Sequence, residues 1–134
     1  MRILVTGDRN YTRKWVVYGM LTGAVSAAYD PEELESRDVV VIEGEADGAD
    51  TLAKEACKVI WGVRVEPHKA DWNGPHGKGA GHVRNQEMVD TGADVCIAFK
   101  DKFDFSPNAK GGTEDCVRRA VDAKIPTYVV VKVN

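Results

Sequence analysis

Five short apolar runs, separated by stretches with helical periodicity, restrict the fold of this chain more than any other feature. They occupy residues 2–6, 39–42, 63–66, 94–99 and 127–131. Most are almost continuously apolar, which is typical of strands buried on both faces of a parallel sheet. The run at 63–66 is shorter and more polar, which favours a position nearer a sheet edge. The alternation predicts a doubly wound α/β domain, with a parallel sheet of about five strands flanked by helices.

Composition fits one globular domain spanning residues 1–134, and no repeat or linker divides it. The hydrophobic content of 43% and the charged content of 29% are ordinary for such a domain and exclude a disordered chain. The net charge of −3 provides no basic field, so nucleic acid is an unfavourable partner. The charged segment at residues 32–37 is expected to be a surface connection.

Cysteine usage and the N-terminal sequence bear on the compartment. Cys57, Cys96 and Cys116 are odd in number and lack CxxC spacing, so we expect buried thiols in a reducing environment. The N-terminus lacks a signal-like apolar region, and no apolar run reaches membrane-spanning length. We therefore expect a cytoplasmic protein without a membrane partner.

Polar and glycine-rich loops follow several of the predicted strands. In doubly wound sheets, ligands bind beyond the carboxyl ends of the strands, where the strand order reverses. The loops that should gather at this edge are residues 7–10, 44–50, 71–85 and 110–115. Their convergence makes a binding site a stronger prediction than any one motif does.

The loop at residues 110–115 joins an apolar run to a helical segment. Gly111, Gly112 and Thr113 at this junction let the backbone approach a ligand closely. They also leave free N–H groups at a helix N-terminus, where phosphate binds readily. The alternative is that the glycines only turn the chain and Thr113 only caps the helix. The segment lacks the GxxxxGK[ST] pattern of a P-loop.

The first loop carries Gly7, Asp8 and Arg9. Gly7 allows a tight turn beside a ligand, and Arg9 offers a planar fork for phosphate or carboxylate. The alternative is a surface arginine beside a turn glycine. No GxGxxG fingerprint is present, so a dinucleotide oxidoreductase is not supported.

The second loop begins at Gly44 and is rich in acids. Glu45, Asp47 and Asp50 disfavour phosphate here and suit sugar hydroxyls, or a metal ion if one is present. Asp50 or Asp47 is also a natural N-cap for the helix that follows. That helix is predicted to carry Val59 toward the core.

The third loop and the helix after it carry Asp71, Trp72, Arg84 and Asn85. Trp72 either stacks against a base or anchors the loop on the core. Arg84 shares a helix face with Met88, so its guanidinium is expected near the apolar side, in a functional role. The alternative is a surface ion pair with the acid three residues later.

Histidines at positions 68, 76 and 82 match no known metal-ligand spacing. We therefore expect no metal site and no cofactor.

Taken together, the motifs resemble the SLOG superfamily, and most closely its YspA-related, cpYpsA-like branch of small single-domain bacterial and phage proteins. The motifs that carry the resemblance are Thr6-Gly7-Asp8-Arg9, residues 44–50, Ala70-Asp71-Trp72, Arg84-Asn85-x-x-Met88 and Gly111-Gly112-Thr113-x-Asp115. The resemblance implies a Rossmann-like fold that binds nucleotides or nucleotide-derived ligands, with phosphate at the Gly-Gly-Thr turn. The superfamily includes DNA-processing proteins and the LOG phosphoribohydrolases, which cleave the N-glycosidic bond of cytokinin nucleotides.

Residue by residue, Arg84 resembles the LOG arginine of the Arg-x-x-x-Met segment, and Asp115 falls near the LOG acidic residue. The departures are a shorter glycine turn, aspartate in place of glutamate, and Asp47 where relatives often carry a basic residue. Phosphate binding tolerates these departures better than glycosidase chemistry does.

Three hypotheses follow. The leading one is a protein that binds a small nucleotide, such as a nucleoside phosphate or an ADP-ribose-like ligand. The alternative is a nucleotide N-glycosidase, in which Arg84 positions the substrate and Asp115 or Glu114 stabilises oxocarbenium character or activates water. The third is a non-catalytic component of a signalling, phage or defence pathway. A homodimer, common in the superfamily, is compatible with the sequence.

Overall fold

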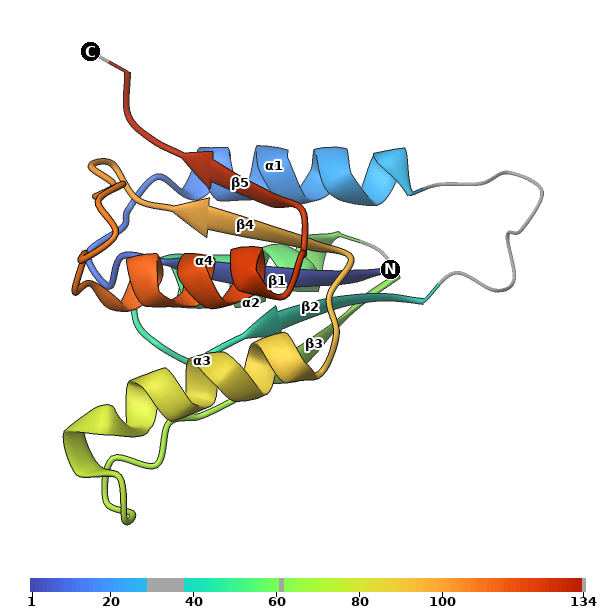
Figure 1. Cartoon of the computed structure of the whole chain (residues 1–134). Helices are drawn as coiled ribbons and strands as arrows, with labels where there is room; N and C mark the ends of the chain where they lie inside the picture. The colour runs from blue at the N-terminus through green and yellow to red at the C-terminus, as the bar shows by residue number, and fades with distance from the viewer. Residues whose placement is uncertain (29–37, 61, 134) are drawn as a thin grey trace.

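A computed structural model of the chain describes residues 1–28, 38–60 and 62–133, so the connection predicted at 32–37 lies outside the described residues. Its centre is one parallel sheet in the order β3-β2-β1-β4-β5. The strands are β1 (Arg2–Gly7), β2 (Val39–Glu43), β3 (Val63–Pro67), β4 (Val95–Phe99) and β5 (Thr127–Val130). This Rossmann-like α/β arrangement in a single small domain confirms the predicted fold class (Figure 1).

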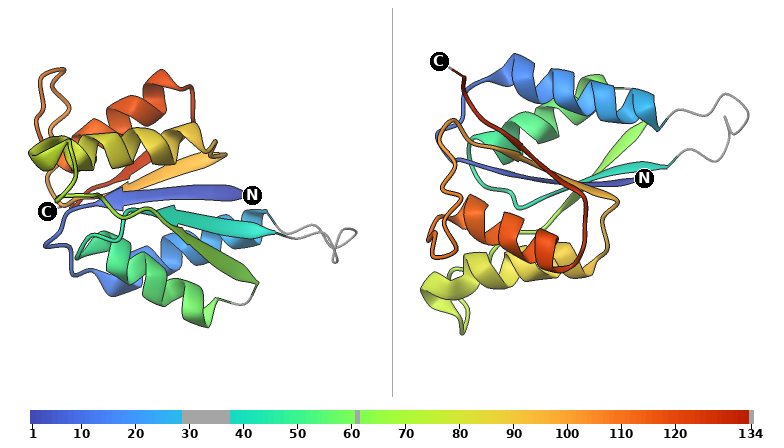
Figure 2. Two further views of the ribbon diagram at one scale, coloured as in Figure 1. Left: turned by 90° about the horizontal axis from the view of Figure 1, so that it is seen from below. Right: turned by 45° about the horizontal axis from the view of Figure 1, so that its top comes forward.

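Helices cover both faces of the sheet (Figure 2). They are α1 (Lys14–Ala27), α2 (Ala49–Val59), α3 (Ala80–Asp90) and α4 (Gly112–Asp122), with a short 3-10 helix, η1 (Gly77–Gly79), before α3. Helices α1 and α2 pack on one face, and α3 and α4 on the other. No helix in the described ranges is long and apolar enough to cross a membrane.

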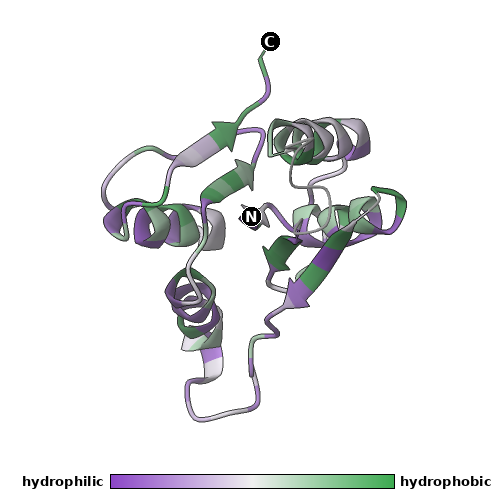
Figure 3. Cartoon of the chain, turned by 90° about the vertical axis from the view of Figure 1, so that its right-hand side faces the viewer, coloured by the Kyte–Doolittle hydropathy of each residue, from purple (hydrophilic) through white to green (hydrophobic). Residues whose placement is uncertain are grey.

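The sheet divides the core into two layers. Ile3 and Val5 pack with α1 and α2, whereas Leu4 packs with α3 and α4, because successive side chains of a strand point to opposite faces. Hydropathy colouring shows the central strands mostly apolar and the helices mixed (Figure 3). All five residues of β2 are buried, whereas β3 is only partly covered at one edge, as its more polar sequence predicts.

Two further predictions have clear outcomes. The three cysteines are buried and free, as expected from their apolar positions: Cys57, Cys96 and Cys116. The inward position predicted for Val59 is wrong, because its side chain is 69% exposed. Helix α2 ends at this residue, and Ile60 is already extended, so the helical periodicity no longer applies there.

Gly7 ends β1 where three elements meet. The Asp8 N–H donates to the Phe99 carbonyl oxygen (3.0 Å), and the Ala49 N–H donates to the Asp8 carbonyl oxygen (3.2 Å). A Cβ atom on Gly7 would lie 2.6 Å from the Phe99 oxygen and would overlap the Ala49 side chain. The absence of a side chain therefore lets β1, β4 and the start of α2 approach one another at the carboxyl edge of the sheet.

We predict that Gly7→Ala lowers the free energy of unfolding by roughly 1–3 kcal/mol, because the added methyl group overpacks this junction. Gly19→Ala is the matched control, since Gly19 lies inside α1 with no atom within 4 Å of the added Cβ. The control should gain about 0.5–1 kcal/mol from higher helix propensity. Urea unfolding measures both, and equal effects would contradict the role assigned to Gly7.

Candidate functional site

A cavity of about 360 Å³ lies at the carboxyl edge of the sheet. It adjoins the ends of β1 and β4, the neighbours between which the strand order reverses. Loops far apart in sequence meet here, as the sequence predicts. The predicted site residues that line it are Gly7, Asp8, Arg9, Asp50, Trp72, Arg84, Asn85, Gly112 and Thr113.

The other predicted residues lie outside this cavity. Gly44 lines a smaller cavity of about 190 Å³, which shares Arg9, Trp72 and Arg84 with the larger one. Asp71, Gly111, Glu114 and Asp115 line neither of these two cavities.

Helix α3 brings Arg84 against the loop that follows β2. Its Nη1 donates to the Gly44 carbonyl oxygen (2.5 Å), and its Nε donates to Asn85 Oδ1 (3.1 Å). A Cβ atom on Gly44 would lie 2.5 Å from Nη1, so this contact needs glycine. The guanidinium therefore binds the β2 loop, and among the described residues it forms no ion pair with Glu87.

Asn85 joins α3 to α4 through its amide. Its Nδ2 donates to the Gly112 carbonyl oxygen (3.1 Å) and to Asp115 Oδ2 (3.0 Å), and Arg119 Nε donates to the same carboxylate oxygen (2.8 Å). Burial raises the pKa of Asp115, but the hydrogen bonds from Arg119 and Asn85 outweigh it, and the net shift is downward. Asp115 is therefore an ionised, buried group that connects two helices beside the cavity rather than within it.

The N-terminus of α4 faces open space. Gly112 and Thr113 line the cavity, and a Cβ atom on Gly112 would meet no atom within 4 Å. Gly111 is the N-cap residue of α4, and no side chain caps the helix there, so the capping role considered for Thr113 is wrong. The free N–H groups of a helix N-terminus attract anions.

Glu114, in the first turn of α4, is paired with a lysine that the sequence reasoning missed. Lys100 Nζ donates to both carboxylate oxygens of Glu114, at 2.6 and 2.8 Å. Lys100 lines the cavity, whereas the Glu114 side chain is only 4% exposed. The position of Lys100, directly after β4 at the point where the strand order reverses, is the signal that could have identified it.

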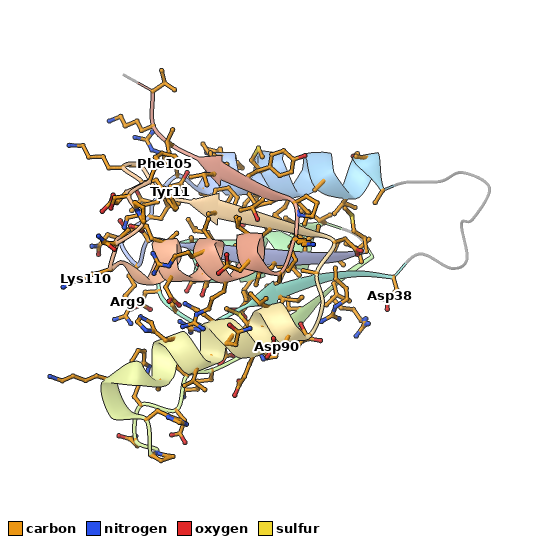
Figure 4. The ribbon with its side chains drawn as sticks, viewed as in Figure 1. Arg9, Tyr11, Asp38, Asp90, Phe105 and Lys110 are labelled. Atoms are coloured by element: carbon orange, nitrogen blue, oxygen red, sulfur yellow. The ribbon has the colours of Figure 1, made fainter. Side chains whose placement is uncertain are left out.

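Further basic residues lie around the cavity. Arg9 projects from the sheet edge on which Lys110 also lies (Figure 4). Its guanidinium carbon is 5.6 Å from the ring centroid of Trp72, a cation–π contact. Trp72 lies against Gly81 at the start of α3, yet 46% of its surface stays exposed. Lys78, from the glycine-rich loop, also lines the cavity, and the sequence reasoning missed it.

Two acids at the cavity are buried: Glu43 ends β2, and Asp50 lies in the first turn of α2 and lines the cavity. Glu43 is fully buried and Asp50 is 5% exposed. Asp50 Oδ2 accepts hydrogen bonds from the Gly44 N–H (3.1 Å) and the Ala46 N–H (3.3 Å). The predicted capping role is therefore wrong: Asp50 holds the loop before its helix, and the N-cap of α2 is Gly48.

The environment of these acids favours their neutral forms. Burial, and then the charge of Glu43, raises the pKa of Asp50 to about 7. Burial is also the main cause that raises the pKa of Glu43, one of whose oxygens accepts a hydrogen bond from the Glu45 N–H. The sequence reasoning missed Glu43, and the available signal was an acid that ends an otherwise apolar strand.

The described ranges contain no group of three or more His, Cys, Asp or Glu side chains arranged to hold a metal ion. Of the histidines, His82 lines the cavity, and His68 Nε2 lies 2.9 Å from Glu66 Oε2, which also accepts a hydrogen bond from Arg2 of β1.

We predict that Lys100→Met lowers stability by about 3–5 kcal/mol, because it leaves the buried Glu114 carboxylate without its ammonium partner. Glu114→Gln should cost less, about 1–2 kcal/mol, since the Lys100 side chain is 23% exposed and water can solvate it. Chemical denaturation of both variants and of the double variant gives the coupling between the two groups. Equal losses in the two single variants would contradict this asymmetry.

No protein-family model matches the sequence. One comparison is informative: the Gene 61 protein of Mycobacterium phage D29 is 38% identical over 133 residues. The match covers 93% of this chain and 92% of the phage protein. At this identity and coverage the chain belongs to the same family as the Gene 61 protein of Mycobacterium phage D29.

Proposed function

We propose that this protein binds a nucleotide or a nucleotide-derived ligand, such as a nucleoside phosphate or an ADP-ribose-like molecule. The observation that carries the proposal is the open space in front of Gly112 and Thr113, inside a cavity at the point where the strand order reverses. A phosphate in that space would accept hydrogen bonds from the N–H groups at the α4 N-terminus.

The charges around the cavity support an anionic ligand. Arg9, Lys78 and Lys100 line it, and the proposal assigns Arg9 and Lys78 to the phosphate, since Lys100 is paired with Glu114. The volume of about 360 Å³ falls within the range of small-molecule sites.

Trp72 is the proposed surface for the base. Its ring is half exposed at the cavity wall and carries Arg9 beside it. A base stacked on an aromatic ring gains about 1–3 kcal/mol. The acidic loop after β2 would then face the sugar, whose hydroxyl groups donate to carboxylates.

The proposal includes SLOG superfamily membership, on the motifs given above. The geometry supports binding more than N-glycosidic hydrolysis, because Asp115 and Glu114 lie outside the cavity and are held by Arg119 and Lys100. A role in a phage pathway has the support of the phage-encoded relative. The three buried thiols favour action in a reducing cytoplasm.

We expect a panel of nucleoside phosphates and ADP-ribose to contain a ligand that raises the Tm. At a concentration of 100 Kd the ligand adds about 2.7 kcal/mol, which corresponds to a rise of roughly 8 °C for a domain of this size. Gly112→Asp should abolish the rise, because its carboxylate would occupy the space proposed for phosphate. That space is open, so the substitution causes no clash.

Gly112→Ala is the matched control, since it adds a side chain at the same place without charge and should retain most of the shift. Unphosphorylated nucleosides should give a much smaller shift than their phosphates. A panel in which no compound stabilises the protein would refute the proposal. Release of free base in the same incubations, lost in Asp115→Asn, would instead support hydrolysis.

A further inference from the structure

Two buried carboxyl groups at the cavity have one oxygen each without a hydrogen-bond partner. Within the described residues these are Glu43 Oε1 and Asp50 Oδ1. Three backbone N–H groups of the loop donate to the other oxygen of each carboxyl group. Glu45 N–H donates to Glu43 Oε2, and the N–H groups of Gly44 and Ala46 donate to Asp50 Oδ2. The loop therefore donates to one oxygen of each carboxyl group and not to the other.

A buried carboxylate oxygen without a donor is costly, and the charge of Glu43 adds to the cost of ionising Asp50. One proton relieves both groups, because it removes one of the two buried negative charges and so lowers the repulsion on the other. We propose that Glu43 and Asp50 share one proton in the ligand-free protein and, acting through Arg84, make the cavity bind anions more tightly when the proton is present. The effect on binding rests on the proposed function, whereas the shared proton does not.

Other charged and titratable groups interact with this pair from every element around it. They are Arg84 on α3, the ion pair of Glu45 and Lys54 (3.4 Å) from the β2 loop and α2, Cys57 on α2 and Cys116 on α4. Burial raises the pKa of Cys57 to about 11 and that of Cys116 to about 12, so both stay neutral thiols. The pair is therefore the group in this cluster whose charge changes near neutral pH.

Arg84 links the charge of this pair to anion binding in the cavity. Its guanidinium lines the cavity and is fixed by the Gly44 carbonyl oxygen of the same loop that the pair organises. With one shared proton, the pair carries one negative charge and balances Arg84. Loss of the proton adds a second negative charge behind Arg84, and an incoming anion then meets net repulsion. Glu43 and Asp50 are thus positioning residues rather than ligands.

The first test needs no ligand. A folded-state pKa of about 7 for Asp50 lies above the usual aspartate pKa of 3.8, so the folded protein holds a proton that the unfolded chain releases. Stability from this proton is complete below the unfolded value and is lost as the pH rises toward 7. In Asp50→Asn the amide oxygen still accepts from the loop, and the amide N–H replaces the proton at every pH.

We therefore expect the urea midpoint of the native protein to fall between pH 5 and pH 8, and that of Asp50→Asn to fall much less. The midpoint of the native protein should therefore drop relative to that of Asp50→Asn as the pH rises. In Glu43→Gln the amide N–H of the new side chain replaces the proton, so its urea midpoint should also change little with pH. The test therefore remains decisive if one of the two variants folds poorly. Parallel pH profiles for the native protein and both variants would overturn the shared proton.

The second test uses inorganic sulfate, whose charge is constant in this pH range. Calorimetry should show the sulfate Kd of the native protein rising several-fold from pH 6 to pH 8, up to about tenfold per pH unit for one linked proton. Asp50→Asn should remove most of that rise. His82 lines the same cavity, so His82→Gln is measured in parallel.

The outcomes separate the two proposals. A pH dependence of sulfate binding that survives in Asp50→Asn, or disappears in His82→Gln, would overturn the role of the pair in binding. Sulfate that binds at no pH, together with the expected stability profiles, would refute the anion site of the proposed function and its link to the pair, while leaving the shared proton established.

Discussion

The adjacent side chains of Arg84 and Asn85 hold together the two loops between which the cavity forms. Arg84 binds the carbonyl oxygen of Gly44 beyond β2, and Asn85 binds that of Gly112 at the start of α4. Their own hydrogen bond, from Arg84 Nε to Asn85 Oδ1, fixes one side chain against the other. A single turn of α3 therefore sets the distance between an acidic loop and a helix N-terminus, and the shape of the cavity depends on it.

The charged residues around Arg84 and Asn85 differ in burial according to their sign. Arg9 and Lys78 stand at the exposed rim of the cavity, whereas Glu43, Asp50, Glu114 and Asp115 are all buried. Each of the last two is neutralised by a basic partner within 3 Å, Lys100 or Arg119. Glu43 and Asp50 accept hydrogen bonds from backbone N–H groups, and the charges that favour their ionised forms are those of Arg84 and, for Glu43, also Lys54. An anion arriving from solvent thus meets cations first, and the acids act only through the field they create behind Arg84.

The sequence predicted the fold and most of the cavity because both follow from local patterns. Buried strands are recognisable as apolar runs, and parallel strands bring the loops after Gly7 and before Gly112 to one edge. Lys100 and Glu43 escaped notice because a single charged residue at a strand end has no periodicity. The position of Asp115 outside the cavity depends on the rotation of α4 about its axis, and its contact with Asn85, which is distant in sequence, could not be predicted from local patterns.

The burial of Glu43 argues for a role beyond stability. An apolar residue at the end of β2 would continue the strand's buried face without any desolvation cost, and replacing buried charged groups by apolar ones is often neutral or stabilising. The backbone bond to Glu45 recovers only part of the cost, since Glu45 itself adopts a positive φ of 54° to supply it. The strained backbone of Glu45 and the unpartnered oxygen of Glu43 both lower the stability of the folded protein. A neighbouring acid that shares its proton, beneath an arginine that lines the cavity, gives that arrangement a physical purpose.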